Sequence, residues 1–355
     1  METSRSAVAI VGAGIIGCLA AREVTRRGGS APVTLLDRDA VGAGATRRSA
    51  GLHLLRGASA RTRHMSSYSH SYYAELASGH PETPIYPVGA TVLADPDLMA
   101  RYLPQAQPEQ VPAPPDKDVT APPDMRTWRI SGSHYCDVYL LAQALALQLR
   151  LRPRVDVLEG VTVTALDSTD DGVTVRCGTG AELDVAAVIL SPGPWLAAPA
   201  WRDLVAPLGL RVKRIVALHI ARQPTPEDEA ILLDRDDAFL LPLVHRGHWL
   251  FSYSCREWDV DPDTPAQGLT AAHLSAARDC LRRYSPALAD ACRGGRLFCD
   301  AYSPDGEPVV RALDPAGRIV FAGAAGGSGY RLGPAIAAEA VDLLAHRSGG
   351  VTSDC

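Results

Sequence analysis

The residues with the clearest chemical meaning form a glycine-rich turn near the start of the chain. Gly12, Gly14 and Gly17 follow a short apolar run, and Asp37 comes 20 residues after Gly17. In a dinucleotide-binding unit, one glycine makes the tight turn, one lets the backbone approach a pyrophosphate, and one lets helix and strand pack closely. The acidic residue accepts hydrogen bonds from ribose hydroxyls. This pattern predicts a bound dinucleotide, and it serves NAD and FAD equally.

The elements that must position this turn follow from the apolar pattern around it. Val8–Val11 is predicted as a buried strand, Ile15–Arg27 as a helix and Val33–Leu36 as a second strand, the order of a βαβ unit in a parallel sheet. Later strands are predicted at residues 155–158, 161–166, 173–177, 185–190, 212–221, 239–244, 249–253 and 318–322, and later helices at residues 64–77, 138–151 and 269–284. A second glycine-rich loop, residues 323–333, follows the last strand, and Pro334 is expected to open the final helix. The proline-rich residues 104–123 are expected to form an irregular surface loop.

Composition excludes several classes of protein. The chain has 355 residues, which fits one bilobal unit or two interleaved domains, and its hydrophobic and charged fractions are those of ordinary globular proteins. The net charge is -5 and the arginines are scattered, which argues against a nucleic acid or an anionic membrane as partner. The eight cysteines form no Cys-x-x-Cys pair and no zinc-like spacing, and no segment reaches a membrane-spanning length of apolar residues. We therefore expect a cytoplasmic protein without a metal or a membrane span, whose partner is a small molecule.

Four further segments resemble the D-amino-acid oxidase superfamily of FAD-dependent oxidoreductases, nearest to monomeric sarcosine oxidase and glycine oxidase. They are residues 44–51, 188–195, 302–308 and 326–334, and with the first glycine turn they extend the resemblance over nearly the whole chain. The resemblance implies an α/β plus α+β fold, in which a Rossmann-type FAD-binding domain is interleaved with a substrate domain built on a mixed or antiparallel sheet. The expected FAD-binding domain comprises residues 1–80, 137–200 and 300–355, and the expected substrate domain comprises residues 81–136 and 201–299.

The same resemblance implies which residues lie against FAD. The segment after the second strand wraps the pyrophosphate, Val163 touches the adenine side, and the second glycine loop lays its N–H groups and a helix N-terminus against the flavin C2 carbonyl. The implied cofactor neighbours are Gly12, Gly14, Ile15, Ile16, Gly17, Asp37, Arg38, Thr46, Arg47, Arg48, Ser49, Val163, Ser191, Gly193, Trp195, Gly327, Ser328, Gly329, Tyr330 and Arg331. Each glycine turn also has a plainer interpretation, as a strand-to-helix connection without a ligand.

For the substrate, the resemblance points first to Arg331, at the family position of a cation that holds the substrate carboxylate, which arginine can do bidentately. Arg56 is a second candidate, at a position whose alignment needs a short insertion. The alternatives are a phosphate-binding or surface-loop arginine for Arg331 and an exposed arginine for Arg56. Tyr253 and Ser254 belong to a segment that resembles the family's active-site strand.

Three positions depart from the family pattern. The histidine beside the flavin falls on Ser254, and the lysine credited with promoting the reaction with oxygen falls on Leu250. The loss of an electropositive group near the flavin removes one argument for a fast oxidase. Asp300 matches the cysteine that attaches FAD covalently in the sarcosine-oxidase branch, and Cys299 stands one residue earlier. A buried structural cysteine is therefore the default interpretation of Cys299, and a covalent link is the alternative.

The predicted function is FAD-dependent oxidation of an amine or amino acid, in which the C–N bond becomes an imine as a hydride passes to flavin N5. This chemistry needs a neutral amine, an aligned C–H bond and a dry pocket, so it requires none of the candidate bases His53, His219, His245 and His248. Molecular oxygen or another acceptor would take the electrons. One alternative is an FAD dehydrogenase or desaturase that uses an acceptor other than oxygen, and another is a non-catalytic flavin-binding partner subunit. The composition resembles that of actinobacterial proteins, which suggests a role in secondary metabolism.

Overall fold

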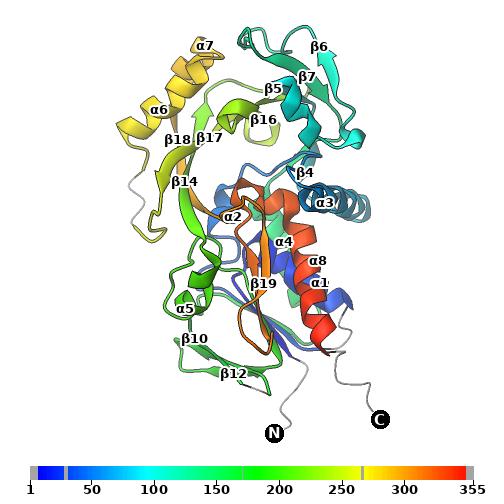
Figure 1. Cartoon of the computed structure of the whole chain (residues 1–355), viewed down its shortest axis with the longest axis vertical. Coiled ribbons are helices and arrows are strands. Elements are labelled where there is room, and N and C mark those ends of the chain that lie inside the picture. Colours follow the sequence, from blue (N-terminus) through cyan, green and yellow to red (C-terminus); the bar gives the residue numbers. More distant parts are fainter. Residues whose placement is uncertain (1–6, 28–30, 170, 265–267, 349–355) are drawn as a thin grey trace. The chain divides into compact units, whose positions relative to one another are not determined.

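The computed structural model describes residues 7–27, 31–169, 171–264 and 268–348, and the chain forms two compact units (Figure 1). The first unit comprises Met1–Ser49, Val138–Val212 and Asp300–Cys355, and the second unit comprises Ala50–Asp137 and Lys213–Cys299. These bounds differ from the expected domains, because residues 50–80 and residue 137 belong to the second unit and residues 201–212 to the first. The short strand at residues 52–53 pairs with residues 134–135, which ties the segment after residue 50 to the second unit.

A six-stranded sheet with continuous apolar strands forms the centre of the first unit. Its order is β19-β20-β13-β1-β2-β9, and all neighbours are parallel except β19 and β20. The side chains of β13 and β20 are almost all buried, as expected of parallel strands that are covered on both faces. The strands are β1 (Val8–Val11), β2 (Val33–Leu36), β9 (Val155–Leu158), β13 (Ala187–Leu190), β19 (Val309–Ala312) and β20 (Ile319–Gly323).

Helices of the first unit begin close behind its strands. α1 (Ile15–Arg27) follows β1 and packs against α4 (Val138–Arg150) and α8 (Gly329–Ser348), and Figure 1 shows α1 beside α8. The remaining elements are α2 (Ala45–Arg48), α5 (Arg202–Val205), the 3-10 turns η3 (Ala206–Leu208) and η6 (Gly326–Ser328), and a separate antiparallel sheet of β10 (Val163–Ser168), β11 (Val173–Cys177) and β12 (Glu182–Val185). Parallel strands alternating with helices form a Rossmann-type fold, in which ligands bind at the carboxyl ends of the strands. The predicted fold class is confirmed.

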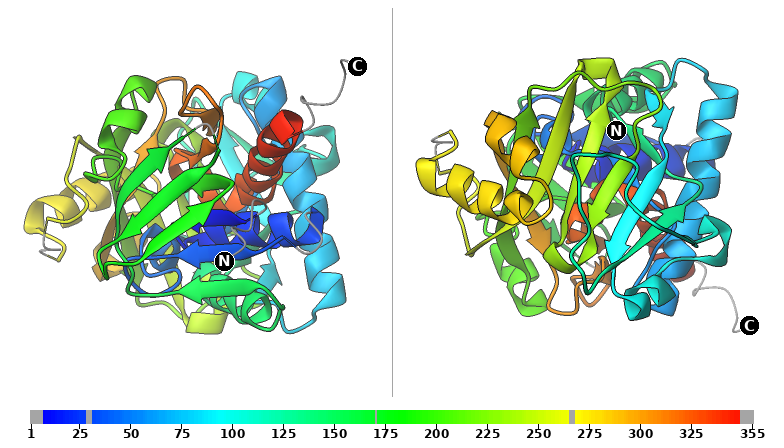
Figure 2. Two further views of the ribbon diagram at one scale, coloured as in Figure 1. Left: turned by 90° about the horizontal axis from the view of Figure 1, so that it is seen from below. Right: turned by 90° about the horizontal axis from the view of Figure 1, so that it is seen from above.

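The second unit is built on an eight-stranded mixed sheet with the order β18-β14-β17-β16-β15-β5-β7-β6, whose strands lie side by side in Figure 2 (right). β15 and β5 are parallel, whereas β14, β17, β16 and β15 are successively antiparallel. The strands are β5 (Ala90–Ala94), β6 (Glu109–Val111), β7 (Arg126–Ile130), β14 (Arg211–Ile220), β15 (Ala230–Leu233), β16 (Ala238–Leu243), β17 (His248–Trp258) and β18 (Cys292–Tyr302). A smaller sheet of β3 (Leu52–His53), β8 (His134–Cys136) and β4 (Ile85–Pro87) and the helix α3 (Ala60–Gly79) complete this unit, together with 3-10 turns at Pro96–Arg101, Pro104–Ala106, Asp234–Asp236 and Val244–Arg246.

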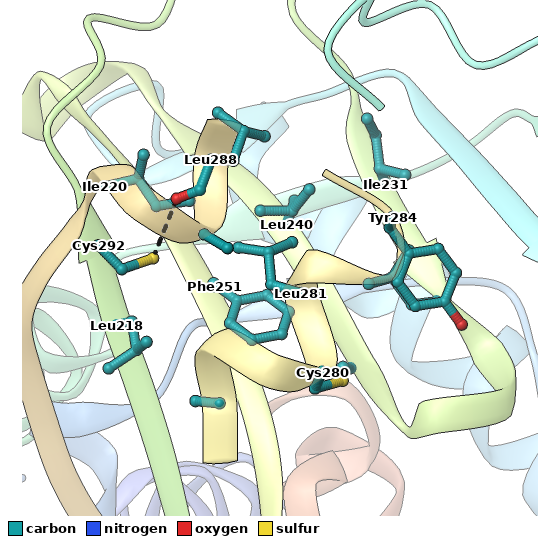
Figure 3. Close-up of a cluster of buried hydrophobic side chains, with 14 of the residues drawn as sticks. Leu218, Ile220, Ile231, Leu240, Phe251, Cys280, Leu281, Tyr284, Leu288 and Cys292 are labelled. Atoms are coloured by element: carbon teal, nitrogen blue, oxygen red, sulfur yellow. Dashed lines mark hydrogen bonds between the residues drawn. The ribbon is translucent and has the colours of Figure 1, made fainter. Parts of the chain in front are cut away.

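Two helices, α6 (Ala271–Arg282) and α7 (Pro286–Ala291), cover one face of the eight-stranded sheet. Leu281 and Leu288 of these helices belong to one buried cluster with Leu218, Leu240 and Phe251 of the sheet (Figure 3). Each buried leucine or phenylalanine contributes about 2 kcal/mol through the removal of apolar surface from water. This face of the sheet is therefore closed by the unit's own core.

The opposite face of the same sheet carries the alternate side chains. Ala217, Leu241 and Leu250 are buried there, in a cluster that includes Leu55 and Tyr102. Because successive side chains of a strand point to opposite faces, the two clusters divide β14, β16 and β17 between them. The sheet thus separates a helix-covered core from a second apolar surface.

Several expectations about single elements are wrong. Pro334 lies inside α8, which begins at Gly329, so the helix starts five residues earlier than expected. The missing N–H of Pro334 removes one helix hydrogen bond, and the packing of α8 against α1 and β20 outweighs that loss. Residues 104–123 are not wholly irregular, because they contain β6, which pairs with β7 at the edge of the sheet.

Among the described residues, no helix combines the length and the apolar character needed to cross a bilayer.

Candidate cofactor and substrate site

The first glycine turn joins β1 to α1 and leaves no room for side chains. Gly12 has φ +101°, and a Cβ there would lie 2.2 Å from the Ser191 carbonyl oxygen. A Cβ on Gly17 would lie 1.8 Å from the Gly12 carbonyl oxygen, so the start of α1 packs directly on the turn. The first N–H groups of a helix lack intrahelical acceptors and, with the helix dipole, attract anions. This donor set suits a pyrophosphate.

Two side chains hold this turn from neighbouring segments. Asp37, directly after β2, accepts hydrogen bonds from the Ala13 N–H at 2.7 Å and the Asp39 N–H at 2.9 Å. Burial raises the pKa of Asp37, and the two N–H donors oppose that change. The Thr46 hydroxyl accepts a hydrogen bond from the Ile15 N–H at 2.9 Å, so α2 caps the first turn of α1. Asp37 presents a half-buried carboxylate beside the turn, and ribose hydroxyls are donors that suit it.

The segment after β13 reaches the same edge of the sheet. The Ser191 hydroxyl donates to the Gly12 carbonyl at 3.1 Å, and Gly193, with φ +58°, turns the chain toward Trp195. The Trp195 ring lies 4.4 Å from the Arg38 guanidinium carbon. The expected neighbours of the adenosine and pyrophosphate parts of FAD are therefore gathered at the carboxyl ends of β1, β2 and β13.

The remaining expected neighbours in this part of the unit lie on α2 and near β10. Arg47 lies over the Tyr139 ring at 5.4 Å, and Arg48 donates to the Ala43 carbonyl at 3.3 Å. Ser49 is the C-cap residue of α2, and its N–H donates to the Thr46 carbonyl. The Val161 N–H donates to the Asp37 carbonyl at 2.8 Å, which holds the start of β10, and with it the buried Val163, beside the end of β2.

The second glycine turn follows β20 and has a different construction. Ala324 has φ +53°, which is uncommon for a residue with a side chain, and Gly326 has φ +54°. The Tyr302 ring covers Gly326, where a Cβ would lie 2.5 Å from a ring carbon. A Cβ on Gly327 or Gly329 would meet no atom within 4 Å. The backbone that leads into α8 is therefore open at both glycines, and the first N–H groups of α8 lack intrahelical acceptors.

Both glycine turns lie at one edge of one sheet. β1, β13 and β20 are adjacent parallel strands, so their carboxyl ends lie at the same edge. Two strand spacings separate β1 from β20, which places the turns roughly 10 Å apart across the sheet. The residues present fit FAD: the start of α1 offers N–H groups to the pyrophosphate, Asp37 accepts from a ribose, and the start of α8 offers N–H groups to a ring carbonyl.

Comparison with known proteins agrees with this fit. Residues 7–343 match the family model DAO, described as FAD dependent oxidoreductase, and the chain therefore belongs to this family. FAD is the cofactor of the family, and the resemblance predicted from the sequence is confirmed. No curated protein matches the sequence.

Similar solved structures share the fold over almost the whole chain. Glycine oxidase from Bacillus cereus ATCC 14579 has 16% identity and a TM-score of 0.75, with 96% of this chain and 95% of that chain covered. Iminodiacetate oxidase from Chelativorans sp. BNC1 has 20% identity and a TM-score of 0.74, with 96% and 95% covered. L-proline dehydrogenase from P. horikoshii has 15% identity and a TM-score of 0.76, with 96% and 93% covered.

The two predicted substrate arginines differ in what holds them. Arg331, in the first turn of α8, donates a hydrogen bond to the Ser328 hydroxyl at 2.6 Å, which anchors it at the second glycine turn. Arg56, in the second unit, forms an ion pair at 2.5 Å with Asp234 and lies over the Tyr102 ring. The Asp234 side chain is 2% exposed, so Arg56 neutralises a buried carboxylate of its own unit. Arg331 is therefore the better candidate for a substrate carboxylate.

Tyr253 and Ser254 are neighbours on β17 that the structure does not bring to a common face. Tyr253 packs against the helix-covered core, and its ring centre lies 6.4 Å from that of Phe251. Leu250 belongs to the cluster on the opposite face. Because alternate side chains of a strand share a face, Ser254 points to the same face as Leu250. Only Ser254 therefore lies on the same face as Leu250, the position at which the family pattern has a lysine.

The cysteines of the described residues are buried and form no disulfide. Leu297 lies in the helix-covered core, so alternation along β18 directs Cys299 to that face and Asp300 to the other. Burial raises the pKa of the Cys18 thiol, behind the first glycine turn, to about 12, which makes it unreactive. Cys355 lies outside the described residues.

Sequence reasoning missed a cluster of imidazoles in the second unit. His53 of β3 stacks on His134 of β8, with ring centres 4.5 Å apart, and on His70 of α3 at 5.5 Å. Burial lowers the pKa of His134 to about 3 and also lowers that of His70. No group of three or more His, Cys, Asp and Glu side chains in the described part of the chain could hold a metal ion. The pairing of β3 with β8 creates this cluster, and no spacing in the sequence reveals it.

Two further candidate histidines lie on the eight-stranded sheet. The ring centres of His219 on β14 and His248 on β17 are 4.6 Å apart. Burial lowers the pKa of His219 to about 4 and also lowers that of His248. His245 packs its ring on Tyr86 at 4.8 Å. His219 and His248 are therefore neutral at pH 7 and add no positive charge to the sheet.

Proposed function

We propose that this FAD-dependent oxidoreductase oxidises the C–N bond of an amine or amino acid to an imine. The observation that carries the proposal is the pair of glycine turns at one edge of the six-stranded sheet, with Arg331 anchored in the helix that follows the second turn. Three proteins of the same fold are named for oxidation of glycine, oxidation of iminodiacetate and dehydrogenation of L-proline. The domain roles expected from the sequence become part of this proposal, with FAD held by the first unit and the substrate domain formed by the second.

Each named residue of the first unit has one task in this proposal. The start of α1 holds the pyrophosphate and Asp37 holds a ribose, while the start of α8 places N–H groups and the positive end of a helix dipole beside the ring. Arg331 orients a substrate through its carboxylate, and the hydrogen bond to Ser328 limits the movement of its guanidinium. When bound, FAD supplies a two-electron acceptor for the substrate C–H bond. No side-chain base is needed if the amine arrives neutral, because positioning lowers the barrier.

A dehydrogenase that passes electrons to an acceptor other than oxygen is the second candidate. The observation that favours it is β17, where Leu250, at the position expected for the oxygen-activating lysine, is completely buried in an apolar cluster. Ser254 lies four residues later on the same face of β17 and carries no charge. A cation near reduced flavin favours the formation of superoxide by Coulomb attraction, and neither position supplies one.

The test is anaerobic mixing of the FAD-loaded protein with a panel of amines and amino acids, including glycine, sarcosine, proline of both configurations and an amine without a carboxylate. Bleaching of the flavin absorbance by at least one member is expected. A colourless protein that refuses added FAD would overturn the proposal. Rapid recovery of the colour in air would identify an oxidase, whereas recovery only with a dye or quinone would identify a dehydrogenase.

A further inference from the structure

Asp300 is an ionisable residue of the first unit to which the proposed reaction gives no task. It lies near the end of β18, two residues before Tyr302, so both side chains leave the same face of the strand. Asp300 and Tyr302 are half-buried, and Ala301 between them is buried on the other face. The Tyr302 ring covers Gly326, and Tyr302 also forms a β-bridge to Ala325. Asp300 therefore lies on the side of β18 that faces the second glycine turn.

The Asp300 carboxyl group forms no side-chain hydrogen bond and no ion pair with the residues that the structure describes. Burial raises its pKa to about 7, and no neighbouring charge contributes to that shift. The titratable groups on adjoining segments are Tyr302 on its own strand, Tyr330 and Arg331 at the start of α8, and Arg211, Lys213 and Arg214 on the neighbouring strand β14. None of these groups contributes to the shift of the Asp300 pKa. A carboxylate that is partly removed from water without a cation or a donor is destabilised, so the neutral acid is favoured below about pH 7.

We propose that Asp300, as a neutral acid, donates a hydrogen bond to bound FAD beside the second glycine turn, and that its ionisation opposes FAD binding. The inference rests on the proposed function, in which both glycine turns hold one FAD. FAD is anionic at its phosphates and offers carbonyl and ring-nitrogen acceptors, so it suits an O–H donor and repels a carboxylate. A carboxyl group that loses water on FAD binding and gains an acceptor must take up a proton wherever it was ionised before binding.

The first experiment measures the dissociation constant of FAD for the apoprotein, by quenching of flavin fluorescence, from about pH 6 to pH 9. The wild-type affinity should be constant below about pH 7 and fall about tenfold per pH unit above it, because binding requires one proton. Asp300→Asn keeps a hydrogen-bond donor without titration, so its affinity should not follow this fall. Asp203→Asn is the matched control, because the Asp203 side chain is 92% exposed, and it should reproduce the wild-type profile.

A second measurement covers the case in which Asp300→Asn does not fold, as judged by circular dichroism. Titration of the wild-type apoprotein with FAD at about pH 8, in two buffers with different heats of ionisation, should show uptake of about one proton. No proton uptake, or a profile of Asp300→Asn that falls as the wild type does, would overturn the inference and leave the proposed function standing. Failure of the wild type to bind FAD at any pH would overturn both.

Discussion

The two glycine turns of the first unit use glycine for different reasons. At the first turn, Cβ atoms on Gly12 and Gly17 would meet backbone oxygens at 2.2 Å and 1.8 Å, and backbone cannot move aside as a flexible side chain can. At the second turn, Gly327 and Gly329 face open space. The glycines of the first turn are therefore required by the fold itself, so a substitution there should impair both folding and FAD binding. At the second turn a side chain would meet no neighbouring atom, so a substitution there should leave the unit folded.

The largest effect is expected for Gly17→Ala, which should break the first turn. The added methyl group overlaps the Gly12 carbonyl, so we expect a loss of about 3 kcal/mol in the free energy of unfolding, together with loss of FAD binding. Urea unfolding of the apoprotein measures the free energy of unfolding, and fluorescence titration measures FAD binding. Gly79→Ala is the control, because a Cβ at the end of α3 meets no atom within 4 Å, and its stability should change by less than about 0.5 kcal/mol. A Gly17→Ala protein as stable as the wild type would contradict the comparison.

The next effect concerns the helix behind the second turn. Arg331→Met should lower kcat/KM for a carboxylate-bearing substrate about 100-fold, because a charge-assisted bidentate contact is lost, while the free energy of unfolding and the affinity for FAD stay near their wild-type values. Steady-state kinetics on the substrate found by anaerobic reduction provides the measurement. Arg202→Met, at an exposed arginine of the same unit, is the control and should leave kcat/KM unchanged. An equal loss with an amine that lacks a carboxylate would assign Arg331 a different role.

A smaller effect, and the sharpest contrast with Gly17, is expected for Gly327→Ala. The methyl group enters open space at a residue without positive φ, so the apoprotein should keep its stability within about 0.5 kcal/mol. The same methyl group would stand between the backbone and FAD, so the affinity for FAD should fall about tenfold. Unfolding of the apoprotein and FAD titration on the same preparation separate the two. If stability falls and affinity does not, the open side of this turn has no part in binding FAD.

The smallest effect is a pH dependence of stability that comes from the second unit and not from the glycine turns. His134 has a folded pKa of about 3, below the ordinary value of 6.5, so the stability it contributes is present above pH 6.5 and is lost as the pH falls toward 3. Between pH 6.5 and 5.5 the free energy of unfolding should fall by roughly 1 kcal/mol for this group. His134→Gln should remove that part of the dependence in urea unfolding, whereas the loss caused by Gly17→Ala should be the same at both values. Equal pH dependence in wild type and His134→Gln would show that another group is responsible.

The sequence alone determined the local parts of the cofactor site. The bounds of β1, α1 and β2 agree with the prediction, because short apolar strands, helical periodicity and a glycine turn are all encoded within 30 residues. The FAD family followed from separate motifs that each have a local meaning. The start of α8 was misplaced, because a proline usually opens a helix and here the packing of that helix overrides the preference.

Only the tertiary structure decided which of these segments lie together. β1 and β20 are separated by some 300 residues, and β13 places them two strands apart with their turns at one edge. The ion pair between Arg56 and Asp234, the stacking of His53 on His134 and the covering of Gly326 by the Tyr302 ring depend on the same kind of pairing. Spacing in a sequence reports on neighbours within a strand or a helical turn, whereas contacts between distant segments are set by how their apolar faces are buried together.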